Sequence, residues 1–170
     1  LIAAAFTEAR RVVAEDGVLT IVFGHGEPEV WHRLLGAITG AGLVLTGSWP
    51  AKTEKGGKVG FSNIVTTLTM ACRPAPTGRS AGRANLVEAD VRKEVRDRIP
   101  MWEAVGLAPT DQLMASAGPA MEVVGRYSEV LDNVGNPVAP SKYLLVARRA
   151  VEEAAAIAID HLPLETFAPR

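Results

Sequence analysis

The strongest constraint on the fold is an alternation of amphipathic and apolar segments in the first third of the chain. Residues 2–13 place apolar side chains at steps of three and four, the period of a helix with one buried face. The run from Val18 to Phe23 is almost continuously apolar, as in a strand buried on both faces of a parallel sheet. A second helix, which begins at Pro28, and a second strand over 43–49 follow in the same order of helix and then strand. Such alternation predicts crossover connections and parallel pairing.

A third strand is predicted over 64–72, where β-branched residues again dominate. The segment before it, Ala51 to Phe61, is rich in lysine and glycine and shows no helical period. Because no crossover helix separates the second and third strands, we expect the third to pair in the antiparallel sense. The cluster from Pro74 to Gly78 then marks a boundary, and no further strand is predicted beyond it.

The rest of the chain is predicted to be helical. Apolar residues recur at every fourth position from Val87 to Ile99, with charged residues between them, so an amphipathic helix is expected that Pro100 ends. The expected fold class is α/β: two parallel strands and one antiparallel strand, the C-terminal half of a Rossmann-like sheet, followed by a helical subdomain. The sheet domain is expected over 1–74 and the subdomain over 75–170.

Composition narrows the class of protein. The 170 residues are 48% hydrophobic and 22% charged, which suits a globular domain with one core. No apolar run is long enough to span a bilayer, so we expect no membrane association and a cytoplasmic location. A single cysteine, Cys72, allows no internal disulfide and no cluster of thiolates for zinc. His32 and His161 have no second ligand at the next helical turn, so no metal site is expected.

Charge is unevenly distributed despite a net charge of −1. Between Lys55 and Val87 the chain carries five basic residues and no acidic one. Basic side chains can hold DNA phosphates and so position a duplex without reading its sequence. The candidates for phosphate contact are Lys55, Lys58, Arg79 and Arg83. The alternative interpretation is an ordinary solvated loop.

Five segments, in order, carry a resemblance to a known family. They are "EARRVVAEDGVLTIVFGH", "EPEVWHRLLGAITGAG", "LVLTGSWPAKTE", "SNIVTTLTMACRP" and the later "SAGPAMEVVGRYSEV". Together they resemble the closing section of amino-methyltransferases that use S-adenosylmethionine, in particular the adenine-specific DNA methylases of the zinc-ribbon group. The matching positions are Glu8 to Val13, Phe23-Gly24-His25, Trp31, Leu34-Leu35, Ala41-Gly42, Trp49-Pro50 and Thr53-Glu54.

The resemblance implies the C-terminal part of a DNA adenine-N6 methyltransferase, with DNA as its partner. In such enzymes the glycine-rich loop for the cofactor and the Asp-Pro-Pro-Tyr motif for the flipped adenine both lie upstream, and neither occurs in this sequence. We therefore expect S-adenosylmethionine to be bound mainly by a missing N-terminal part, and these 170 residues to be inactive alone. Leu1 to Ala5 looks like the inside of a helix, which also suggests a fragment.

The carboxyl edge of the parallel strands is where an open α/β sheet binds its ligand. His25 and Trp49 are predicted to end the first two strands, Glu54 follows, and Asn63 begins the third. A flipped base needs an aromatic or apolar wall and hydrogen bonds to its edge, so these four residues are the candidates for contact with substrate or DNA. The alternatives are a loop histidine bonded to backbone, a strand-end tryptophan packed on the first helix and a solvated loop carboxylate.

A second functional class is a non-catalytic α/β module whose basic loop binds nucleic acid or a protein partner. An upstream sequence without the glycine-rich loop and the Asp-Pro-Pro-Tyr motif would favour it. A small hydrolase finds no support, because the sequence has no nucleophile elbow and no Ser/His/Asp set.

Overall fold

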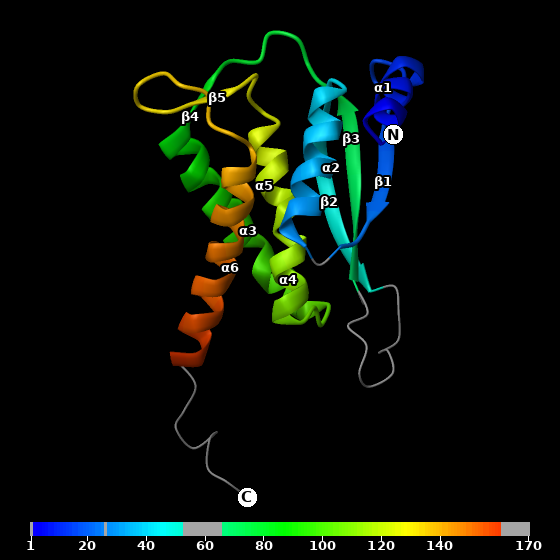
Figure 1. Ribbon diagram of the computed structural model, residues 1–170. Helices are drawn as coiled ribbons and strands as arrows, with labels where there is room; N and C mark the ends of the chain where they lie inside the picture. Colours follow the sequence, from blue (N-terminus) through cyan, green and yellow to red (C-terminus); the bar gives the residue numbers. More distant parts are fainter. Residues whose placement is uncertain (1, 26, 53–65, 161–170) are drawn as a thin grey trace, which may run out of the picture.

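The computed structural model describes residues 2–25, 27–52 and 66–160, and the protein has an α/β fold (Figure 1). The elements in chain order are α1 (Ile2–Val12), β1 (Leu19–Phe23), α2 (Pro28–Gly40), β2 (Leu43–Lys52), β3 (Thr66–Pro74), β4 (Gly82–Arg83), α3 (Ala84–Ala104), α4 (Pro109–Ala115), α5 (Ala117–Val124), β5 (Val130–Leu131) and α6 (Ser141–Asp160).

The main sheet has the strand order β1-β3-β2 in the described part of the chain, and β3 is antiparallel to both neighbours. The predicted antiparallel third strand is confirmed. The strands β1 and β2 run in the same direction, but the expected direct pairing between them is wrong because β3 lies between. Leu68, Met70 and Cys72 of β3 form a fully buried row on the face that the helices cover.

The prediction that β1 is buried on both faces is also wrong. None of its five residues is fully buried, and the Val22 side chain is 61% exposed. On the opposite face, Phe23 meets the ring of Trp31 of α2 edge-on, with 5.1 Å between ring centroids. Helices thus cover the face of the sheet that carries Phe23 and Leu68, and leave the face of Val22 open. Because β1 is an edge strand covered on one face, an apolar run alone could not reveal its exposure.

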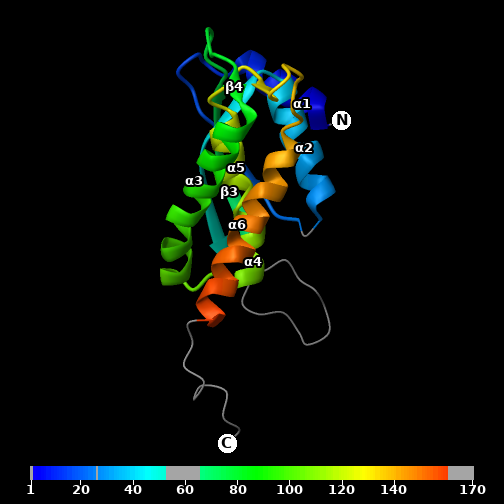
Figure 2. The same cartoon turned by 90° about the vertical axis from the view of Figure 1, so that its left-hand side faces the viewer.

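Helix α5 is the centre of the helical part, since every one of its residues is buried. It packs on β2 on one side and on α3 and α6 on the other. Figure 2 shows α3 and α6 side by side in front of the sheet. The predicted row of α3 is confirmed, because Val87, Val91 and Val95 are fully buried and Ile99 is nearly so. Pro100 does not end the helix, which runs on to Ala104. Burial of Trp102 in this last turn offsets the hydrogen bond that proline cannot donate.

The two-residue strands β4 and β5 pair in parallel, Gly82 with Val130 and Arg83 with Leu131. They were not predicted, because two residues show no periodicity. The strand β3 ends at Pro74, where the domain boundary is expected, yet one hydrophobic core contains residues from both sides of it. No helix in the described ranges is long and apolar enough to cross a membrane.

Candidate functional site

The carboxyl ends of β1 and β2 lie at one end of the sheet. Phe23 of β1 and Pro50 of β2 both pair with Leu68 of β3. The two strands therefore end at the same level of the sheet, on either side of the start of β3. This is the edge at which the sequence places its substrate-facing candidates. Two of these candidates, His25 and Trp49, fall within the described residues. Glu54 and Asn63 lie outside them.

His25 follows β1 and shapes the turn into α2. Its Nδ1 accepts a hydrogen bond from the Glu27 backbone N–H at 3.0 Å, and its carbonyl oxygen accepts one from Trp31 Nε1 at 2.8 Å. The imidazole stacks on Phe23, with 6.4 Å between ring centroids. These contacts are those of a loop histidine bonded to backbone, on the helix-covered side of the sheet.

Trp49 belongs to the opposite face. It pairs with Thr69, which in turn pairs with Val22, so these three residues form one row across the sheet. The indole is 55% exposed. It lies over Gly47, where an added Cβ would come within 2.8 Å of the ring. The structure therefore places His25 and Trp49 at the same end of the sheet but does not bring their side chains together.

We call the open surface around Trp49 the Trp49 face. Its rows come from all three strands and alternate with the helix-covered positions. The residues of this face nearest to Trp49 are uncharged: Thr20, Val22, Gly47, Ala51, Thr67, Thr69 and Ala71. Farther along β3, Arg73 lies on the same face and donates to the Asp16 carbonyl oxygen. An indole among threonines and small side chains can stack on a planar group. The described residues near Trp49 on this face include no acidic or basic side chain that could act in catalysis.

The described part of the basic segment lies at the other end of the sheet. Arg79 and Arg83 follow the Pro74 end of β3, whereas the segment that holds Lys55 and Lys58 joins the opposite strand ends and is not described. Arg83 is exposed at the start of α3. Arg79 is half-buried, and its Nη1 donates to the carbonyl oxygens of Gly125 at 2.9 Å and Tyr127 at 2.6 Å. Arg79 therefore already holds the chain after α5.

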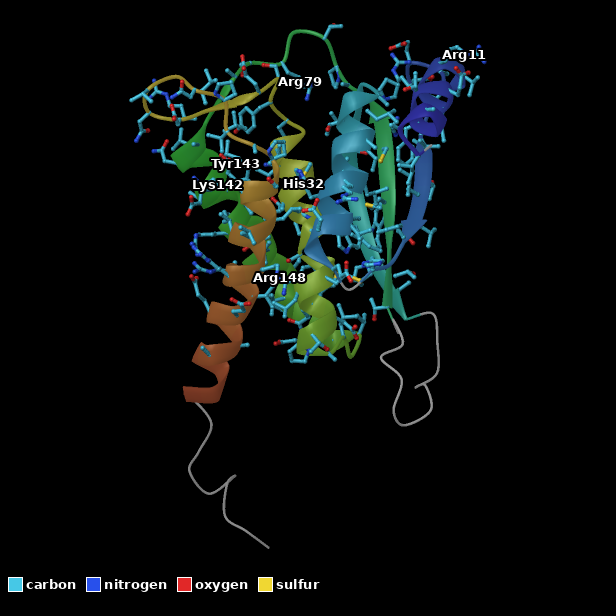
Figure 3. The ribbon with its side chains drawn as sticks, viewed as in Figure 1. Arg11, His32, Arg79, Lys142, Tyr143 and Arg148 are labelled. Carbon is cyan, nitrogen blue, oxygen red and sulfur yellow. The ribbon has the colours of Figure 1, made fainter. Side chains whose placement is uncertain are left out.

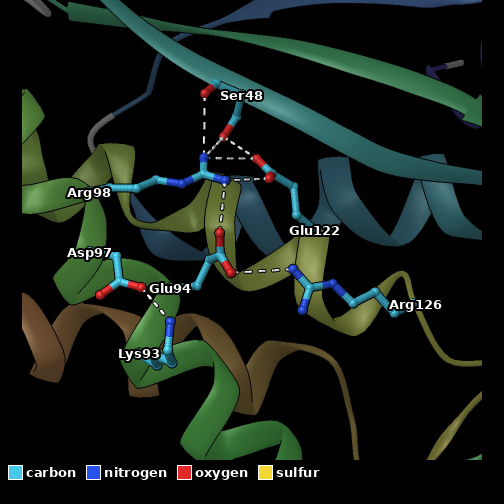
Figure 4. A network of polar contacts seen from close by, with 7 residues as sticks. All are labelled: Ser48, Lys93, Glu94, Asp97, Arg98, Glu122 and Arg126. Carbon is cyan, nitrogen blue, oxygen red and sulfur yellow. Dashed lines mark hydrogen bonds and ion pairs between the residues drawn. The ribbon is translucent and has the colours of Figure 1, made fainter.

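An ion pair between a partly buried arginine and a buried glutamate joins the helices to the sheet on the side opposite to the Trp49 face (Figure 4). Arg98 of α3 donates from Nη2 to Glu122 Oε2 of α5 at 2.5 Å. The Ser48 hydroxyl of β2 donates to Glu122 Oε1 at 2.5 Å and lies 3.2 Å from Arg98 Nη1. Glu94 links this set to Arg126, whose Nη2 is 3.3 Å from Glu94 Oε2. Since Ser48 precedes Trp49, the cluster holds the strand that presents the indole.

The cluster is structural in its chemistry. Burial acts to lower the pKa of Arg98, but the hydrogen bond and the charge of Glu122 outweigh it, so the pKa of Arg98 is raised. The guanidinium therefore stays protonated. The Ser48 hydroxyl donates its hydrogen bond to Glu122, whose carboxylate is already paired with Arg98. A buried serine in this state is not an activated nucleophile.

Sequence reasoning missed this cluster, although one signal was present. Glu122 lies between Met121 and Val123 in a helix that is apolar on every side, and such a carboxylate needs a buried partner. Nothing in the sequence points to Arg98, which is 24 positions away and is one of several arginines on α3.

Other reactive groups offer no second site. The Cys72 thiol is fully buried, and burial raises its pKa from 9.0 to about 12, so it is not a reactive thiolate. In the described ranges no three His, Cys, Asp or Glu side chains come together as metal ligands.

No family model, curated protein or solved structure matches this chain significantly.

Proposed function

We propose that this chain is the C-terminal part of a DNA adenine-N6 methyltransferase that uses S-adenosylmethionine, and that it completes the sheet and helps to bind DNA. The observation that carries the proposal is the arrangement of β1, β2 and β3. Two strands of the same direction, linked through α2, end at one edge with an antiparallel strand between them. This is the strand, helix, strand and antiparallel strand that the resemblance implies. Among the matching residues, these elements contain Phe23, Trp31, Leu34, Leu35, Trp49 and Pro50.

Two surfaces support the involvement of a further part of the protein. The outer edge of β1 has no strand partner among the described residues, and such an edge is a template for another strand. The Trp49 face is open and carries two exposed large apolar side chains, Val22 and Trp49, which a further layer would bury. An N-terminal half that contributes strands beside β1 and a layer over this face would complete a two-sided α/β sheet.

The cofactor itself does not fit the described residues. The turn after β1 is already closed, because the Glu27 N–H binds the His25 ring and the His25 carbonyl binds Trp31. The sequence has no Gly-x-Gly-x-x-Gly pattern after a strand. The proposal therefore assigns S-adenosylmethionine to the preceding part of the protein, and assigns to this chain the wall of the crevice formed by Trp49.

The first test concerns the cofactor and the reaction. By calorimetry, these 170 residues should show no binding of S-adenosylmethionine in the micromolar range, because the loop that holds it is upstream. The protein encoded with its upstream sequence should contain the glycine-rich loop and the Asp-Pro-Pro-Tyr motif. It should also form N6-methyladenine in unmethylated DNA, as measured by mass spectrometry. Micromolar binding by the 170 residues would refute this division of roles, and an upstream sequence without both motifs would favour the non-catalytic module.

The second test concerns DNA binding by that longer protein. Reversing the charges with Lys55→Glu, Lys58→Glu and Arg83→Glu should weaken binding. The slope of log affinity against log salt concentration should become less negative by about 0.9 for each lost phosphate contact. Arg79 is left intact because it holds two backbone carbonyls. The control is Arg149→Glu, an exposed arginine of α6 outside the basic segment. Equal effects of the triple variant and the control in fluorescence anisotropy would show that the basic segment is ordinary solvated surface.

A further inference from the structure

A pocket of about 320 Å³ lies at the end of the sheet opposite to the Trp49 edge. It is lined by the start of β2, the end of α5 and the segment around β5. Arg79, from the loop after β3, also lines it and is labelled in Figure 3. Its size is within the range of small-molecule sites. Aliphatic side chains dominate its walls, among them Leu43, Val124, Val130 and Val138. Tyr127 adds an aromatic surface.

Arg79 is the cation that lines this pocket. Its Nη1 uses both hydrogens on the carbonyl oxygens of Gly125 and Tyr127, which fixes the plane of the guanidinium. Its Nε is buried and has no hydrogen-bond partner among the described residues. A buried donor without a partner is rare and calls for a water or a ligand. No carboxylate of the described chain forms an ion pair with Arg79.

Because Nη1 is occupied and Nε is shielded from solvent, Nη2 is the group of Arg79 that remains for a ligand. A hydrogen bond from a guanidinium to a carboxylate is charge-assisted and therefore stronger than one between neutral groups. Glu129 also lines the pocket, but it is exposed. Its charge is therefore solvated and opposes a bound anion only weakly. The pocket thus combines an apolar body with one fixed positive group.

We propose that this pocket binds a small organic acid, with its carboxylate on Arg79 and an apolar or aromatic body against the aliphatic walls. The site is separate from the proposed methyl-transfer edge, since the pocket lies at Leu43 and Val44, where β2 begins, and Trp49 lies near the end of the strand. The proposal does not depend on DNA or on S-adenosylmethionine.

The test uses phenylacetate, with neutral phenylacetamide as the matched probe, in an amide NMR titration of the 170-residue chain. Phenylacetate should shift the amides of Gly125, Tyr127 and Val130 in a saturable way. The affinity for phenylacetamide should be lower by a factor of about ten or more, because the neutral amide forms no charge-assisted pair with Arg79. Arg79→Gln should reduce the affinity for phenylacetate to that for the amide.

A second variant tests the cavity without touching Arg79. Val138→Trp fills the pocket and should abolish the shifts, whereas Val134→Trp, at a position that is 81% exposed and outside the pocket, should leave them unchanged. Equal affinities for the acid and the amide would overturn the role of Arg79. Shifts that do not saturate, or that survive Val138→Trp, would overturn the site.

Discussion

Glu122→Gln should lower the free energy of unfolding by about 3 kcal/mol, the lower end of the cost of removing one partner of a buried ion pair, because Arg98 is only partly buried. Glu122 is 9% exposed, and both of its carboxylate oxygens accept bonds from Arg98 or Ser48. The neutral amide would remove the nearer of the two carboxylates that pair with Arg98, leaving only Glu94, whose Oε1 lies 3.5 Å from Nη2. Its NH₂ group would also face the guanidinium or the serine hydroxyl. Urea unfolding followed by circular dichroism measures the change.

The matched control is Glu29→Gln. Its partner Arg33 lies one helical turn away, and both side chains are largely exposed, so loss of this pair should change stability by less than about 1 kcal/mol. The double variant Glu122→Leu with Arg98→Met should recover much of the loss, because no uncompensated charge remains buried. If Glu122→Gln behaved like the control, the cluster would not hold α3 and α5 to the sheet.

Gly118→Ala should destabilise the protein by about 2 to 3 kcal/mol, as overpacking of a close core contact does. A Cβ on Gly118 of α5 would stand 2.0 Å from the Ser48 hydroxyl oxygen and 2.5 Å from the Ser48 Cβ. It would also lie 3.3 Å from Leu68. The strand β2 cannot yield easily, because Ser48 is held by Glu122 and Arg98. Thermal and urea unfolding give the magnitude.

Gly36→Ala provides the control within the same fold. Gly36 is also a helical glycine, in α2, but an added Cβ there meets nothing within 4 Å. The substitution should therefore stabilise the protein by about 0.5 to 1 kcal/mol, the gain in helix propensity from glycine to alanine. Opposite signs for the two variants would show that close packing of α5 on β2 makes Gly118 necessary. The same sign for both would contradict it.

The features that sequence reasoning predicted correctly depend on neighbouring residues. The buried row of α3 follows from a four-residue repeat between Val87 and Ile99, because side chains one helical turn apart share a face. The antiparallel direction of β3 was predicted because the sequence shows no helical pattern between the second and third strands. Both inferences need only the local pattern and the length of a connection.

Tertiary structure decided the rest. The order β1-β3-β2 depends on how the three strands pair and pack in the folded protein, and it puts β1 at an edge of the sheet. The side of the sheet to which Trp49 points depends on its register with Thr69, because a shift of one residue turns a side chain to the other face. Likewise Ser48 and Glu122, 74 positions apart, meet only after α5 has packed on β2. Contacts between distant segments leave no periodic trace in a single sequence, and the surroundings of Trp49 and Arg79 are built from such contacts.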